Sequence, residues 1–177
     1  MNQFFTAWLL TLGLGSGSVH TDFNKNFFSK PGFASEINFT AVFDKQYLGF
    51  GLNFRRNQVL YSNWSRIYTE DSQDHFNLQY FQVNIFTGGD LISFSEATKI
   101  SGFGGVSLTQ NLELGLNGSL LLSYTNRKIL PRTIYYLKFE TDYWGSDLLE
   151  DYQDSKNGHG DFYFGLVVGL QFEFETK

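Results

Sequence analysis

Three observations predict that this chain is all-β and closes into an antiparallel up-and-down barrel that crosses a membrane. Apolar and polar residues alternate along most of the 177 residues, and no long segment shows a period of 3.6 residues. Aromatic residues make up 19% of the chain, with 18 Gly and only 2 Pro, which suits long strands. Several apolar faces are also longer than the strands of soluble proteins require. We expect a single domain over residues 1–177.

Composition and charge exclude several classes of protein. Charged residues make up only 18% of the chain, and the high aromatic content is unlike that of disordered segments. A net charge of −5 argues against a nucleic-acid partner, which requires a basic patch. The chain has no Cys, so a disulfide framework and a thiolate metal site are excluded, and we expect no cofactor and no metal site. No apolar run reaches the roughly 18 residues of a transmembrane helix.

The first strand is expected over residues 4–19. Trp8, Leu10, Leu12 and Leu14 fall on one face at a period of two. The alternative for this segment is a retained signal sequence, because Phe4–Leu14 is as apolar as the core of a signal peptide.

The last strand and the hairpin over residues 33–56 give the strongest patterns. Seven apolar residues alternate from Phe162 to Phe174, which fits the roughly 9–11 residues of a membrane-crossing strand. In the hairpin, a turn at residues 44–47 places Phe39 opposite Leu52 on an apolar face. The same register places Glu36 opposite Arg55, and Asn38 opposite Asn53, on a polar face.

Two further connections are predicted from turn residues. Gly88-Gly89 suits a tight hairpin turn, and Asn111 is expected to take a left-handed conformation in a short loop that pairs Leu108 with Leu112. Residues 91–109 would then be one long strand.

These segments add up to eight strands, and their outward and inward residues follow from the alternation. Even strand numbers with short turns and longer loops are typical of outer-membrane barrels. The short 109–111 loop breaks the alternation, so ten strands remain an alternative. The expected strands are 4–19, 33–44, 47–60, 75–87, 91–109, 112–126, 132–144 and 161–175. The expected membrane-facing residues include Trp8, Phe39, Phe50, Leu116, Phe139, Phe164, Leu170 and Phe172. The expected polar residues of the lumen include Glu36, Asn38, Asn53, Arg55, Glu113, Asn117, Lys138, Glu140 and Glu173.

The alternating strands, the aromatic content and the C-terminal Gly-Leu-Gln-Phe-Glu-Phe of residues 169–174 resemble small bacterial outer-membrane barrels of the OmpA/OmpX type. Members of this family usually end on an aromatic residue, whereas here three residues follow Phe174. The resemblance implies an integral protein of the outer membrane of a Gram-negative bacterium. An eight-stranded barrel has an interior just wide enough for side chains to fill, so we expect a plugged lumen.

Outward glycines suggest a contact surface. Gly102 is expected to face Gly118 on the lipid side, with Gly104 beside them, and small residues allow another chain to approach closely. The competing explanation is local, because strand glycines also permit bulges and coiling. Basic residues are candidates for contact with lipid phosphates at the rim of the barrel. These residues are Arg55, Arg56, Arg66, Lys25 and Lys30.

The predicted function is a non-enzymatic structural or surface-interaction role, with phospholipid or lipopolysaccharide as partner and a homo-oligomer that organises envelope lipid. Three alternatives stay open. The first is a lipid-modifying hydrolase with a rim site, because His75 and His159 lie near Asp residues. The others are a narrow channel and a soluble lipocalin-like barrel, which would place its apolar residues inside.

Overall fold

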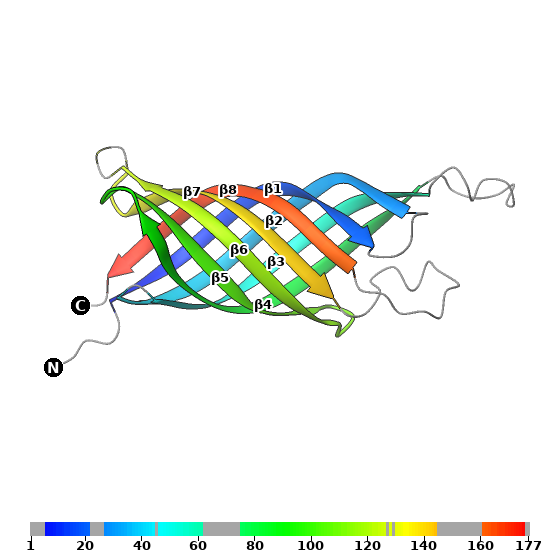
Figure 1. The fold of residues 1–177 in the computed structure, drawn as a ribbon, viewed down its shortest axis with the longest axis horizontal. Coiled ribbons are helices and arrows are strands. Elements are labelled where there is room, and N and C mark those ends of the chain that lie inside the picture. Colours follow the sequence, from blue (N-terminus) through cyan, green and yellow to red (C-terminus); the bar gives the residue numbers. More distant parts are fainter. Residues whose placement is uncertain are drawn as a thin grey trace, which may run out of the picture.

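A computed structural model describes residues 6–21, 27–44, 46–61, 75–126, 128, 130–144 and 161–175. Within these residues, eight antiparallel strands form one closed barrel in chain order, and β1 closes it by pairing with β8 (Figure 1). The strands are β1 (Ala7–Thr21), β2 (Phe27–Phe43), β3 (Gln46–Tyr61), β4 (His75–Ser93), β5 (Thr98–Thr109), β6 (Leu114–Thr125), β7 (Thr133–Trp144) and β8 (Asp161–Glu175). The prediction of eight strands is confirmed, and the ten-strand alternative is wrong.

The two ends of the barrel differ in their connections. Both termini lie at one end, together with the short β2–β3, β4–β5 and β6–β7 turns (Figure 1). The strand ends joined by residues 22–26, 62–74 and 145–160 lie at the other end, as does the short turn at residues 110–113. Outer-membrane barrels have short periplasmic turns and longer extracellular loops, so the end with the termini is periplasmic. The short 109–111 loop therefore belongs to the extracellular end and does not disturb the strand count.

The predicted turn at Gly88-Gly89 is wrong. Both glycines lie inside β4, and residues 94–97 form the turn to β5. Ser95 closes this turn, because its Oγ accepts hydrogen bonds from two backbone N–H groups at 3.2 and 3.1 Å. Gly88 instead permits close packing, since a Cβ there would lie 2.2 Å from the carbonyl oxygen of Gly102. The expectation of a single strand over residues 91–109 is also wrong, because the turn at residues 94–97 separates β4 from β5.

The β2–β3 hairpin has the predicted faces in a different register. Phe39 pairs with Phe50 rather than Leu52, and Glu36 does not lie opposite Arg55. β2 ends at Phe43, which pairs with Gln46 at the start of β3, so the pairing is offset by two residues from the expected one. Because a shift of two preserves the alternation, every side chain stays on its expected face.

The β5–β6 hairpin shows the same offset. Leu108 pairs with Leu114 rather than Leu112. The left-handed residue of the turn is Leu112, at φ 65°, and not Asn111.

The outer surface of the barrel is apolar in its periplasmic part on every strand. On β5–β8 the apolar outer face continues to the extracellular end, where Leu114 is 68% exposed. On β1–β4 it ends earlier, and the exposed residues beyond it include His20, Arg56, Asn77 and Gln79. Strands β2–β4 also extend furthest at this end (Figure 1). These strands have 16 to 19 residues, more than the roughly 9–11 that span a bilayer, so their ends project beyond it.

Candidate functional site

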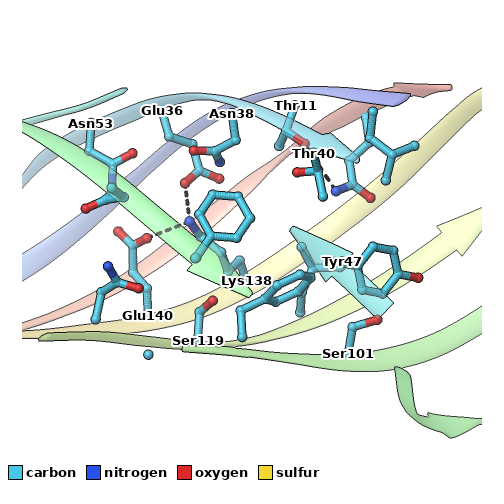
Figure 2. Close-up of a pocket in the computed structure, with 18 of the residues that line it drawn as sticks. Thr11, Glu36, Asn38, Thr40, Tyr47, Asn53, Ser101, Ser119, Lys138 and Glu140 are labelled. Carbon is cyan, nitrogen blue, oxygen red and sulfur yellow. Dashed lines mark hydrogen bonds and ion pairs between the residues drawn. The ribbon is translucent and has the colours of Figure 1, made fainter. Parts of the chain in front are cut away.

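Charged side chains from β2, β3 and β7 form one ion network across the lumen. Arg55 contacts Glu140. Lys138 contacts both Glu36 and Glu140, the latter at 2.6 Å (Figure 2). The Tyr136 hydroxyl donates to Glu36 Oε1 at 2.7 Å. None of these five residues is more than 8% exposed. The ion pair expected between Glu36 and Arg55 is replaced by two contacts across the lumen, because each of the two side chains faces β7.

The other residues expected in the lumen do not belong to the ion network, and they lie at three separate places in the barrel. Asn38 and Asn53 are buried and, with Asn117, line an internal cavity. Glu113 lies in the turn between β5 and β6, where Thr109 Oγ1 donates to its carboxylate at 3.3 Å. Glu173 is half-buried near the periplasmic end of β8.

An apolar and aromatic cluster lies in the lumen on the extracellular side of the ion network. It consists of Val19, Leu78, Tyr80, Trp144 and Tyr163, all at most 6% exposed. The Tyr80 and Trp144 rings meet edge to face, with centroids 5.5 Å apart. The guanidinium of Arg55 lies 4.8 Å from the Tyr163 ring centroid, so the ion network packs directly against this extracellular cluster.

Glycines of β1 and β8 make room for two of the tyrosines. A Cβ at Gly17 or Gly165 would lie 2.3 or 2.5 Å from the Tyr163 hydroxyl oxygen. A Cβ at Gly13 would lie 2.1 Å from the hydroxyl oxygen of Tyr136. The small residues on the inner faces of these strands therefore let both rings lie across the lumen.

A cavity of about 70 Å³ occupies the periplasmic half of the lumen. Lys138 and Glu140 lie at its inner part, while Tyr47 and Ser101 lie toward the opposite end (Figure 2). Roughly 10–15 Å³ is enough for one water molecule, so this cavity can hold several. It is far smaller than the roughly 300–1,000 Å³ of sites for organic ligands.

Four side chains form a polar group at the periplasmic end of the cavity. Asp90 accepts from Lys99 Nζ at 3.1 Å and from the hydroxyls of Ser101 and Tyr47 at 2.7 Å each. Lys99 also lies over the Tyr47 ring, 5.1 Å from its centroid. The Lys99 side chain is 34% exposed, so the cavity extends to the periplasmic surface of the barrel.

Sequence reasoning missed several residues of the lumen. Asp142 is 3% exposed and accepts a hydrogen bond from Gln82 Nε2 across the lumen at 3.0 Å. Trp144 is fully buried. Asp142 and Trp144 have the same parity as Lys138 and Glu140, so continued alternation along β7 would have placed both inside.

The expected membrane-facing residues lie on the outside of the barrel. Six are 41–61% exposed, and the other two, Leu170 and Phe172, are half-buried. The six are Trp8, Phe39, Phe50, Leu116, Phe139 and Phe164. An apolar exterior around a polar interior contradicts the lipocalin-like alternative.

The three outward glycines pair differently from the prediction. Gly104, not Gly102, faces Gly118, and Gly102 faces Leu120. A Cβ at Gly104 or Gly118 would approach no heavy atom closer than 3.7 Å, so neither glycine is required by packing within the barrel.

The residues expected near a catalytic rim site are only partly described. No group of three or more His, Cys, Asp or Glu side chains among them is placed to hold a metal ion. His75 begins β4, and His159 lies outside the described residues. None of the described residues forms a helix that is long and apolar enough to cross a membrane.

Comparison with known proteins bears on the fold alone. No family model matches the chain, and no curated protein matches it by sequence. The crystal structure of Ail, the attachment invasion locus protein of Yersinia pestis, in complex with the heparin analogue sucrose octasulfate, superposes with a TM-score of 0.52 at 13% identity. The match covers 94% of this chain and 99% of Ail. The fold is that of a small outer-membrane β-barrel.

Two further solved structures also match. The de novo designed TMB2.3 matches over 99% of this chain and 100% of its own, with a TM-score of 0.50 and 9% identity. The outer-membrane protease OmpT of Escherichia coli matches over 95% of this chain and 97% of its own, with a TM-score of 0.43 and 10% identity. A closed barrel with an apolar exterior satisfies its backbone hydrogen bonds within lipid, which places this chain in the bacterial outer membrane.

Proposed function

We propose that this chain is a non-enzymatic outer-membrane protein with a sealed lumen, which acts through its surface rather than by transport. The observation that supports this proposal is that two layers of buried side chains lie one against the other inside the barrel. The extracellular cluster around Trp144 and Tyr163 lies against the ion network of Arg55, Lys138 and Glu140, and all of these residues are buried. These two layers of buried side chains support a lumen that solutes do not cross.

Ion conductance in planar lipid bilayers tests the sealed lumen. The purified chain should insert without producing steady single-channel currents, and the matched control is a porin of known conductance in the same membrane. Reproducible current steps from the unaltered chain would support the narrow-channel alternative and contradict the proposal.

We further propose that the projecting outer face of β2 and β3 contacts phosphate groups of outer-leaflet lipid. Lys30 and Arg56 are exposed there, just beyond the apolar belt, and Lys30 pairs in register with Gln58 next to Arg56. No ion pair to either cation is present within the described part of the chain. Arg55, the third described candidate for this rim, points into the lumen instead. The complex of Ail with a polysulfated sugar gives a precedent for an anionic ligand on this fold.

Retention of lipopolysaccharide by the purified barrel tests this contact. Lys30→Gln combined with Arg56→Gln should reduce retention of phosphorylated lipopolysaccharide and leave retention of the dephosphorylated form unchanged. Lys128→Gln, which removes an exposed cation from the periplasmic turn, is the matched control. Equal retention by the double variant and the control would refute the contact. Binding to heparin without any dependence on lipid phosphate would indicate a glycan partner instead.

A specific observation favours self-association as well. Thr87, Gly104, Gly118 and Thr141 lie side by side across β4, β5, β6 and β7, and all four face lipid. Because Gly104 and Gly118 have free space outside them, this shallow row leaves room for a second copy of the chain, whose close approach would exclude lipid.

Light scattering after size exclusion in detergent tests the association. The unaltered chain should give a discrete multiple of the 20.3 kDa protomer, and Gly118→Phe should give the protomer. Leu12→Phe, an outward change of similar kind on β1, should leave the multiple intact. A protomer mass for the unaltered chain would reject self-association, and unchanged assembly of Gly118→Phe would reject this surface.

A further inference from the structure

The central lumen carries one more negative charge than positive charge among the described residues. Three carboxylates, Glu36, Glu140 and Asp142, are each at most 4% exposed, and two cations, Arg55 and Lys138, face them. Buried charges in proteins are paired, coordinate an ion or are neutralised, because an isolated charge in a low-dielectric interior is strongly destabilised. The surplus charge therefore needs a partner.

Each of the two cations contacts at least one glutamate, although the Nε of Arg55 has no hydrogen-bond partner. Arg55 contacts Glu140 and donates to the backbone carbonyl of Ser35 at 3.3 Å. Lys138 contacts Glu36 and Glu140. Asp142 forms no direct ion pair with either of these cations; its Oδ1 accepts from the neutral amide of Gln82, while its Oδ2 has no hydrogen-bond partner.

Two amide oxygens near this carboxylate also lack a donor. Gln82 uses its amide nitrogen on Asp142, which leaves its Oε1 without a partner. Asn84, two residues along β4, lies beside the Asn53 amide, and its own Oδ1 has no partner. Asn84 is 6% exposed, and both Asn84 and Asp142 line the periplasmic cavity.

We propose that the inner end of this cavity binds one partly hydrated alkali cation, Na⁺ or K⁺, between the Asp142 carboxylate and the amide oxygen of Asn84. An amide oxygen and a single carboxylate carry little charge, which suits a monovalent ion better than Mg²⁺ with its demand for strict octahedral geometry. The volume of about 70 Å³ accommodates such an ion with several waters. The ion enters from the periplasmic side, because the extracellular cluster closes the other side.

Thermal and urea unfolding of the full chain in detergent tests the site, with NaCl or KCl compared with choline chloride at equal ionic strength and fixed pH. Choline is too large for the cavity. A ligand that binds only the folded state lowers the unfolding equilibrium constant by the factor 1 + [L]/Kd, about tenfold at roughly ten times Kd. The small cations should therefore stabilise the unaltered chain relative to choline.

Two variants locate the effect. Asp142→Asn keeps the acceptor for Gln82 and removes the surplus charge, so its stability should be the same in all three salts. Asp44→Asn is the matched control, because Asp44 is exposed in the periplasmic turn at φ 56°, a conformation that Asn adopts readily, and it should retain the full cation effect. If Asp142→Asn does not fold, sodium NMR line broadening by the unaltered chain, reversed by excess K⁺, replaces it.

Three outcomes would overturn the proposal. Equal stability of the unaltered chain in sodium, potassium and choline salts, with no sodium line broadening, would show that no ion binds. A cation effect that survives in Asp142→Asn would place the ion elsewhere. Stability that changes with pH alone, identically in all three salts, would show that a proton neutralises the carboxylate.

Discussion

Replacement of Arg55 by Ala tests whether the ion network stabilises the barrel. Arg55 is fully buried, and its guanidinium contacts Glu140 and packs on the Tyr163 ring. Among the described residues, its removal leaves the three carboxylates of the central lumen with Lys138 as their one cation. Breaking a buried pair by removing one partner destabilises proteins by about 3–5 kcal/mol, so we expect a loss of that size.

The loss is measured by urea unfolding of the refolded chain in lipid vesicles, followed by tryptophan fluorescence. Arg56→Ala is the matched control, because the neighbouring side chain is exposed on the outside of the same strand. A surface change of this kind stays within about 0.5 kcal/mol. Bilayer conductance of Arg55→Ala should remain absent, since the extracellular cluster still closes the lumen.

Two results would refute this reasoning. A loss below about 1 kcal/mol, or equal losses for the two variants, would show that the network does not stabilise the fold. Steady conductance from Arg55→Ala would show that the aromatic cluster is not a seal by itself.

The remaining predictions concern glycines that permit close packing. Gly165→Ala brings a Cβ within 2.5 Å of the Tyr163 hydroxyl, so the unfolding free energy should fall by about 1–3 kcal/mol, whereas Gly104→Ala meets no atom closer than 3.9 Å and should change it by less than about 0.5 kcal/mol. Equal urea midpoints for these two variants would contradict the difference in packing. Gly88→Asn should lower the urea midpoint strongly, because Gly88 lies inside a strand and a Cβ there would be only 2.2 Å from the carbonyl oxygen of Gly102. An unchanged midpoint would instead indicate a hairpin turn there, where Asn is favoured.

Much of the architecture could be predicted because a strand has a period of two. The register errors at Phe39 and at Leu108 were both shifts of two residues, so they left every side chain on its expected face. The residue types that favour turns predicted the positions of the turns less well than the alternation predicted the faces of the strands. Gly88-Gly89 looks like a turn in the sequence, but glycine also serves where another backbone approaches, and only the packed sheet distinguishes the two uses.

The candidate site was predicted in composition but not in its contacts. Glu36, Arg55, Lys138 and Glu140 were all expected inside the barrel, and all are buried. The pairing expected within one hairpin, Glu36 with Arg55, is absent, because each side chain reaches across the lumen to β7.

By itself, the sequence determined the fold class, the number of strands and the face of the sheet on which each side chain lies, because these follow from local alternation and strand length. The tertiary structure decided which lumen residues meet. Closure of the barrel brings β7 opposite β2 and β3, and it brings Asp142 opposite Gln82 on β4. Such contacts join strands that are not neighbours in the sheet, so they depend on the curvature and register of the closed barrel, which no local pattern encodes.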